Sequence, residues 1–318
     1  MAVCCACKMA DFNAFYRSTV LATAEASWVK SFLTRNGWRL GVGRFVAGRD
    51  VTEAVPKLEA IEAAGKSVIL DVLGEFVTSE AAARVTAERI LASIDVVNDA
   101  QIEPYFSVKP TQLGLGVSFD LALELAGDIA ERLQVVGGRL CLDMENSPQV
   151  ESTLELLERL RGAGHTHVGT VLQSYLHRTP DDLNRLLALS PTPSLRIVKG
   201  AYKEPPEVAM QAKADVESAF ERLVETVLEA GQQVNIATHD ERLIERLLAF
   251  CKGAGVGRER YEIQMLYGVK PALQDRLTSA GESLRLYVPF GDDWYGYYSR
   301  RLAERPANLM FVIRGLFG

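Results

Sequence analysis

The sequence contains no uninterrupted apolar run that approaches the roughly 18 residues needed to span a bilayer. Its N-terminus lacks the charged start and the apolar core of a secretory signal. Five cysteines, three of them crowded at Cys4, Cys5 and Cys7, do not predict a disulfide framework. These absences argue against a secreted or membrane-spanning protein, and we expect a cytoplasmic chain.

Basic residues are not in excess either. The chain has 35 Lys and Arg against 41 Asp and Glu, a formal net charge of -6, and no basic stripe. This balance disfavours nucleic acid as a partner. The four histidines and the cysteine cluster lack the ligand spacing of a zinc site, and we expect no metal.

What the sequence does have is a large apolar content and a regular alternation. Its 318 residues are 48% hydrophobic, enough for a sizeable core. From Ser67 onward, short β-branched runs alternate with segments of helical periodicity. The strand-like runs are 67–75, 103–109, 139–145, 167–175, 195–200, 233–239, 261–266 and 284–289. Helical patterns cover 79–94, 119–133, 150–160, 207–230 and 241–250.

Eight strands alternating with helices favour a (β/α)₈ barrel over residues 67–318, with an open doubly wound sheet as the competing architecture. Residues 1–66 lack a strand pattern. They contain helical stretches at 11–33 and 52–64, separated by a break at Asn36-Gly37. We expect this segment to form a helical arm before the barrel, and residues 308–317 to form a short apolar cap.

Polar residues collect where the predicted strands end. Side chains at the carboxyl ends of barrel strands face the active-site mouth. Charged residues in apolar strands are costly to bury unless they are paired or contact a ligand. A polar site in the barrel mouth is therefore expected, and its candidates are Glu75, Lys109, Asp143, Glu145, Gln173, Arg196, Lys199, Thr238, His239, Asp240, Gln264 and Tyr287.

Several chemistries are open to these residues. Lys109 could be a Schiff-base lysine, an anion-binding lysine or a solvated residue. Alternation along the strand puts Arg196 and Lys199 on opposite faces, one of them toward the lumen. Asp143 and Glu145 suit either a metal ion or a structural ion pair.

The densest signal is Tyr297-Tyr-Ser-Arg-Arg-Leu-Ala-Glu304. In a helix, Tyr297, Arg300, Arg301 and Glu304 share one broad face. Two adjacent guanidinium groups there would bind a carboxylate or a phosphate. A solvated helix with an Arg300–Glu304 pair is the alternative.

Taken together, the motifs resemble those of proline dehydrogenases, and they occur in the family's order across about residues 44–308. The matching segments are LDVLGE (70–75), SVK (107–109), LDME (142–145), LQSY (172–175), LRIVKGAY (195–202), ATHD (237–240), EIQML (262–266), LYVPFG (286–291) and YYSRRLAE (297–304).

The resemblance implies a distorted barrel that holds FAD noncovalently, with the last helix over the substrate. L-Proline would give hydride to flavin N5 and become Δ1-pyrroline-5-carboxylate, the first step of its degradation to glutamate. The implied catalytic residues are Asp143, which orients Tyr287 or Lys109, and Arg196 beside the flavin. The implied substrate-binding residues are Lys109, Tyr202, Leu266, Tyr287, Tyr297, Arg300 and Arg301.

The resemblance also implies a cofactor set and a gate. The cofactor residues would be Met144, Gln173, Arg196, Val198, Lys199, Gly200, Ala201, Thr238, His239, Gln264 and Glu304. Glu75 is expected to pair with Arg300 or Arg301 as a gate over the pocket.

Partners follow from the same resemblance. Reduced FAD would pass its electrons to a membrane quinone, which implies a peripheral contact with the inner face of the membrane. The chain is too short for a second catalytic module, so a separate pyrroline-carboxylate dehydrogenase is expected to take the product. Two other readings remain: a Schiff-base aldolase or lyase using Lys109 or Lys199, and an inert carboxylate-binding barrel.

Overall fold

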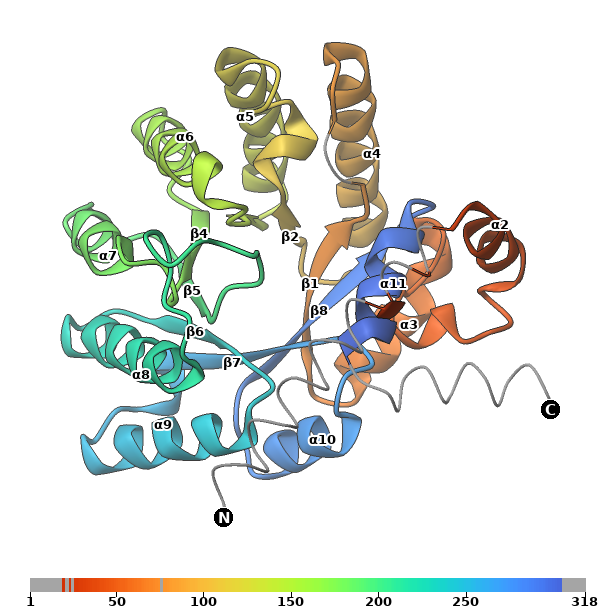
Figure 1. Cartoon of the computed structure of the whole chain (residues 1–318). Coiled ribbons are helices and arrows are strands. Elements are labelled where there is room, and N and C mark those ends of the chain that lie inside the picture. The colour runs from red at the N-terminus through yellow and green to blue at the C-terminus, as the bar shows by residue number, and fades with distance from the viewer. Residues whose placement is uncertain (1–18, 21–22, 24–25, 75–76, 305–318) are drawn as a thin grey trace.

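The computed structural model describes residues 19–20, 23, 26–74 and 77–304 (Figure 1). Its centre is a closed barrel of eight parallel strands, each paired with its neighbour in the sequence, and the last strand pairs with the first. The strands are β1 (Ser67–Val72), β2 (Tyr105–Val108), β3 (Arg139–Leu142), β4 (Val168–Gln173), β5 (Leu195–Val198), β6 (Val234–Ala237), β7 (Tyr261–Leu266) and β8 (Leu284–Phe290). Closure confirms the predicted barrel and excludes the open sheet.

Helices surround the barrel, as Figure 1 shows. Between successive strands lie α4 (Glu80–Asp99), α5 (Phe119–Val135), α6 (Val150–Gly162), α7 (Thr179–Leu187), α8 (Lys213–Glu229), α9 (Glu241–Gly253) and α10 (Pro271–Ser279). Helix α4 illustrates why they form: Ser79 caps its first turn by accepting from the backbone N–H of Ala82. Its buried residues recur every three or four positions, which turns one face toward the strands.

The predicted start of one helix was wrong. The pattern put it at Glu207, but α8 begins at Lys213. The backbone before it bonds to the loop after β4 instead: Met210 N–H donates to Tyr175 O, and Val208 O accepts from His177 N–H. Because these groups are committed to another segment, they cannot join the helical ladder. The two nine-residue helices α7 and α10 were not predicted either.

Before the barrel lie α2 (Ser27–Asn36) and α3 (Val51–Ala63). Helix α2 ends at the predicted break, and α3 packs against β1 and α4. Most of the predicted helix 11–33 and the cap 308–317 lie outside the described residues. The division of the chain at residue 66 therefore stays a prediction.

The last helix, α11 (Trp294–Glu304), packs on the segment around α2 instead of completing the outer ring beside the strands. Leu33, Leu40 and Phe45 from that segment form a buried cluster with Trp294, Tyr298 and Leu302. Tyr298 also donates a hydrogen bond to Leu40 O at 2.8 Å. These contacts hold α11 at the carboxyl ends of the strands, which is the predicted distortion of the barrel. Within the described ranges, no helix has both the length and the apolar character to cross a bilayer.

Candidate active site

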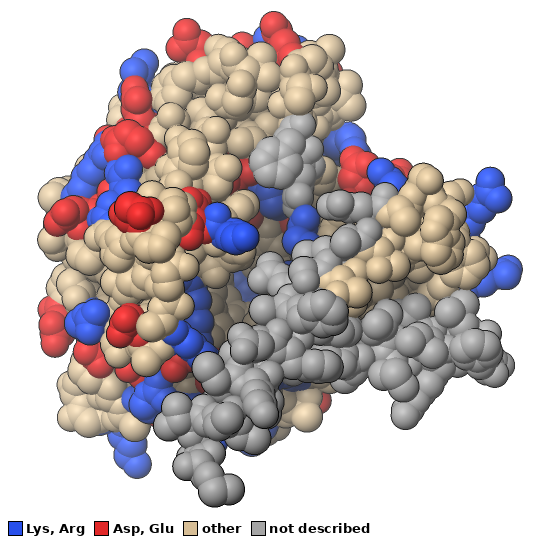
Figure 2. Space-filling model, viewed as in Figure 1, with Lys and Arg blue, Asp and Glu red and all other residues tan. Residues whose placement is uncertain are grey.

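A pocket of about 860 Å³ opens at the carboxyl ends of the strands, within the range of about 300–1,000 Å³ that ligand pockets span. Every predicted site residue whose side chain is described lines it. These are Lys109, Asp143, Met144, Glu145, Gln173, Arg196, Val198, Lys199, Gly200, Ala201, Tyr202, Thr238, His239, Asp240, Gln264, Leu266, Tyr287, Tyr297, Arg300 and Arg301. Glu75 and the side chain of Glu304 lie outside the described part of the chain. In Figure 2, several basic side chains lie along the part of the hollow that the grey atoms do not cover.

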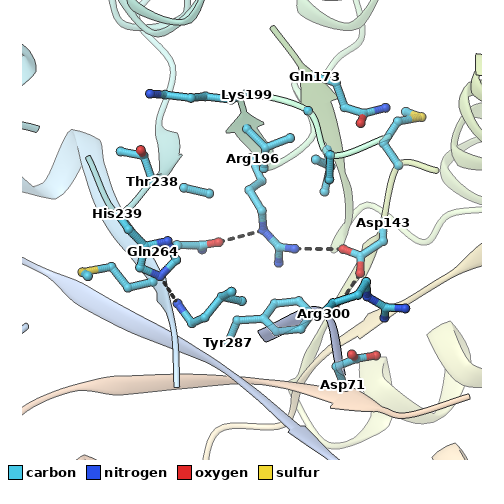
Figure 3. Close-up of a pocket in the computed structure, with 18 of the residues that line it drawn as sticks. Asp71, Asp143, Gln173, Arg196, Lys199, Thr238, His239, Gln264, Tyr287 and Arg300 are labelled. Carbon is cyan, nitrogen blue, oxygen red and sulfur yellow. Dashed lines mark hydrogen bonds and ion pairs between the residues drawn. The ribbon is translucent and has the colours of Figure 1, made fainter. Parts of the chain in front are cut away.

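Arg196 crosses the middle of the pocket from β5 (Figure 3). Its side chain is only 5% exposed. Its Nε donates to Gln264 Oε1 at 2.7 Å, and its Nη1 donates to Asp143 Oδ1 at 2.9 Å. The buried Nη2 has no hydrogen-bond partner in the described part of the chain. An unsatisfied buried guanidinium nitrogen is costly, which indicates that a bound group completes it.

Asp143 follows β3 and connects three strands. Its Oδ1 accepts from Ser107 Oγ at 2.6 Å as well as from Arg196, and its Oδ2 accepts from Tyr287 Oη at 2.7 Å. Burial and the neighbouring carboxylates raise the pKa of Tyr287 well above its ordinary value. The tyrosine therefore remains a hydrogen-bond donor in the working pH range.

Lys109 extends from the end of β2 between two carboxylates. Its Nζ lies 3.0 Å from Asp71 Oδ1 and 4.0 Å from Asp143 Oδ2. Burial raises the pKa of Asp71, and the charge of Lys109 opposes that rise. The sequence reasoning missed Asp71. A carboxylate inside the apolar run Val68-Ile-Leu-Asp-Val72 was the available signal.

Lys199 lies at the pocket rim with its own acidic partners. Its Nζ donates to Glu217 Oε1 at 2.8 Å and to Asp240 Oδ2 at 3.0 Å. Burial opposes the charged form of Asp240, but the hydrogen bond and charge of Lys199 outweigh it and lower its pKa to about 2. Arg196 is thus the residue that crosses the lumen, and Lys199 faces the helices at the rim.

These ion pairs also bear on the aldolase reading. A Schiff-base lysine must present a neutral amine. Both Lys109 and Lys199 instead form ion pairs with carboxylates at hydrogen-bond distance. The geometry therefore supports charge recognition by these lysines.

Other predicted residues are fixed by backbone contacts. His239 Nε2 accepts from the backbone N–H of Leu266 at 2.8 Å, and Gln173 Nε2 donates to Glu145 O at 2.8 Å. The carboxylate of Glu145 accepts from the backbone and hydroxyl of Thr111. Glu145 is thus committed to a structural hydrogen bond and Asp143 to an ion pair. No cluster of potential metal ligands occurs among the described residues, and the cysteine cluster lies outside them.

Helix α11 closes one side of the pocket with Tyr297, Arg300 and Arg301. The Arg301 guanidinium lies 5.1 Å from the centre of the Tyr297 ring. Three of the four residues predicted to share one face of the helix thus lie together at the pocket, and the side chain of the fourth, Glu304, is outside the described part of the chain. Together with Lys109, they give the pocket cationic groups suited to a small carboxylate.

Gly200 lies where the backbone leaves β5, with φ +114°. A side chain there would overlap the ring of Tyr175. The position therefore requires glycine, because Tyr175 already packs against this stretch of backbone and the φ is one that other residues rarely adopt. The unsatisfied Arg196 Nη2 in the pocket wall fits a polar group of a bound ring such as that of a flavin.

The sequence matches the family model described as proline dehydrogenase over residues 54–314. It is 42% identical over 305 residues to a proline dehydrogenase from Deinococcus radiodurans, covering 95% of this chain and 97% of that protein. It is 35% identical over 300 residues to proline dehydrogenase 2 of Bacillus subtilis, covering 94% and 98%.

A similar fold occurs in the crystal structure of proline utilization A from Bdellovibrio bacteriovorus inactivated by N-propargylglycine. The TM-score is 0.80 at 22% identity, and the match covers 92% of this chain and 36% of that one. This likeness supports the fold, while the matches along the sequence carry the family assignment. The chain belongs to the proline dehydrogenase family.

Proposed function

We propose that this chain oxidises L-proline to Δ1-pyrroline-5-carboxylate with FAD as its electron acceptor. The observation that carries the proposal is the convergence, in one pocket, of the described motif residues, with a cationic group on α11 and a second cationic group at the end of β2. A bound flavin would supply a two-electron acceptor for the hydride that leaves the ring carbon next to the proline nitrogen.

The substrate carboxylate would be held by Lys109, Arg300 and Arg301. Guanidinium groups bind carboxylates through paired N–H donors, so they fix orientation as well as position. Asp71 would hold the Lys109 ammonium in place from below. The aliphatic ring would lie among Leu266, Tyr202 and Tyr297, whose side chains exclude water from the reacting carbon.

The cofactor would be held by the wall formed by β4, β5 and β6. Arg196 would direct its unsatisfied Nη2 at the flavin, where a positive charge favours the reduced form. Gly200 and Ala201 would give backbone contact, and Met144, Gln173, Val198, Lys199, Thr238, His239, Gln264 and Glu304 would complete the set. Glu75 would close the pocket by pairing with Arg300 or Arg301.

We further propose that the reduced enzyme delivers electrons to a quinone at the inner face of a membrane, and that a separate dehydrogenase consumes the product. Helix α2 offers a surface for that contact. Trp28 is 72% exposed and Phe32 is 43% exposed, one turn apart on the same face. The same helix carries Arg35 in its last turn and Lys30, whose Nζ lies 5.9 Å from the centre of the Tyr295 ring. Exposed aromatic residues beside basic ones suit an anionic bilayer surface.

Cosedimentation with vesicles tests this contact. We expect the full chain to bind vesicles that contain anionic lipid, and a Trp28→Ser/Phe32→Ser variant to lose that binding while keeping its activity with a water-soluble acceptor. Equal binding by both proteins would overturn the assignment to α2.

The reaction is tested by the visible spectrum of the purified protein, recorded anaerobically before and after L-proline is added. Flavin bands that bleach with L-proline are the expected result. Flavin that stays oxidised would reject proline as the substrate, and failure to find or reconstitute FAD would reject the cofactor. A colourless protein to which borohydride covalently links a carbonyl substrate would support the Schiff-base aldolase instead.

A further inference from the structure

Beneath the pocket, the barrel interior is filled by a chain of charged and polar side chains. It begins at Arg196 and continues through Gln264 to Glu262, Arg285 and Glu103. Gln264 Nε2 donates to Glu262 Oε1 at 2.8 Å, and both residues lie on β7 two positions apart, so they point to the same side of the strand. Neither Glu262 nor Arg285 lines the pocket.

The Gln264 amide could be placed in two orientations that differ by exchange of its oxygen and nitrogen. Only one of them serves Arg196, whose Nε requires an acceptor and finds Gln264 Oε1 at 2.7 Å. The reverse orientation would set an N–H donor against another N–H donor. Arg196 thus favours one orientation, and a contact that accepts only from the amide nitrogen would fix the same orientation from the other end.

Glu262 does this because a carboxylate only accepts hydrogen bonds. It can pair with the nitrogen end of the Gln264 amide and not with the oxygen end. Its carboxylate is itself held by Arg285, whose Nε lies 2.8 and 2.9 Å from the two oxygens. Arg285 is in turn fixed by Glu103 at 2.9 Å and by the backbone oxygen of Val68 at 2.6 Å.

We propose that Glu262 is a positioning residue that sets the orientation of Arg196 through the Gln264 amide, although it lies outside the pocket. This inference rests on the proposed function, in which the Arg196 charge favours reduced flavin. Without Glu262, the amide is free to turn. Arg196 then loses the acceptor on its Nε, and its guanidinium is no longer held against the cofactor.

The test is the midpoint potential of the flavin in Glu262→Gln, measured in purified FAD-bound protein without proline. Removal of a nearby negative charge raises a flavin potential, whereas displacement of Arg196 lowers it. We expect a decrease that corresponds to at least a tenfold shift of the oxidised-to-reduced equilibrium, or about 30 mV for a two-electron couple.

Glu103→Gln is the matched control. It also removes one carboxylate partner of Arg285, but Glu103 has no hydrogen bond to Gln264. Both variants should unfold at a similar, lowered temperature, and only Glu262→Gln should have a lower potential. If Glu262→Gln does not fold, Glu262→Asp keeps the charge beside Arg285 and withdraws the carboxylate from Gln264. We expect its potential to fall as well.

A double variant tests the route. Because Glu262 acts through Gln264, adding Glu262→Gln to Gln264→Ala should lower the potential no further. A Glu262→Gln potential equal to or above that of Glu103→Gln would overturn the inference, and so would additive shifts in the double variant. If proline reduces the wild-type flavin in these cases, the proposed function stands. If the wild type binds no FAD, the proposed function fails first.

Discussion

Tyr287 donates a hydrogen bond to Asp143 across 2.7 Å, and this bond ties strand β8 to the loop after β3 over the centre of the pocket. The same carboxylate holds Arg196 through its other oxygen. A tyrosine that would contact the substrate and an arginine that would contact the cofactor are therefore fixed by one aspartate. Replacing either Tyr287 or Arg196 should therefore affect the position of the other.

Tyr287→Phe should lower kcat/KM for proline by about tenfold or more, because a hydrogen bond to a charged group contributes about 1.5–3 kcal/mol. Steady-state kinetics with a soluble acceptor would measure this. Tyr261→Phe is the control, since Tyr261 also donates to a carboxylate, Glu282, at 2.9 Å but does not line the pocket. Equal losses in the two variants would contradict a specific role for Tyr287.

Asp71→Asn should raise the KM for proline by about tenfold, because Lys109 would lose its ionised partner at 3.0 Å. The pKa of Asp71 is raised in the folded protein, so its ionisation lowers stability as the pH rises above its unfolded pKa. The asparagine of the variant cannot ionise. The free energy of unfolding of the variant, relative to that of the wild type, should therefore be highest at high pH.

Asp275→Asn provides the reference for that variant. Asp275 pairs with Lys66 at 2.5 Å, but its side chain is 66% exposed and does not line the pocket. Its replacement should leave the KM for proline unchanged. It should change the free energy of unfolding by no more than about 0.5 kcal/mol. If the KM of Asp71→Asn is also the same as that of the wild type, Asp71 has no part in substrate recognition.

Gly200→Ala should reduce FAD binding and destabilise the fold by about 1–3 kcal/mol, because the new methyl group meets Tyr175 and the backbone has φ +114°. Gly137→Ala tests the positive φ without the steric clash. Gly137 also has positive φ, +70°, but nothing lies within 4 Å of an added Cβ. FAD titration and thermal unfolding of both variants should show that only Gly200→Ala loses cofactor.

The lowered pKa of Asp240 predicts that the stability of the fold depends on pH. Its pKa is lowered to about 2, so the stability it contributes is present above its unfolded pKa and is lost as the pH falls from about 4 toward 2. Asp240→Asn retains a residue that can cap α9, where Asp240 accepts from Leu243 N–H. We expect it to be less stable than wild type by about 1 kcal/mol at neutral pH, with the difference vanishing near pH 2. A constant difference across this range would contradict the assignment.

The sequence alone determined the eight alternating strands and helices, favoured the barrel over an open sheet and identified most residues of its mouth. Strands such as Tyr261–Leu266 are marked by local alternation, and a parallel barrel sends all its strand ends to one rim. That rule is sufficient to predict that Lys109 and Arg196 lie at the same rim. The motif order then gave the family, since ordered motifs carry more information than any one of them.

Tertiary structure alone decided what depends on distant partners. The start of α8 moved to Lys213 because backbone groups from the loop after β4 bind the preceding residues. Asp71 became part of the site only when the pairing of β1 with β2 set it beside Lys109, 38 positions along the chain. The support of Gln264 by Glu262 likewise depends on Arg285 from the next strand. Local periodicity shows which way a side chain points, but its partner is set by the strand that packs opposite.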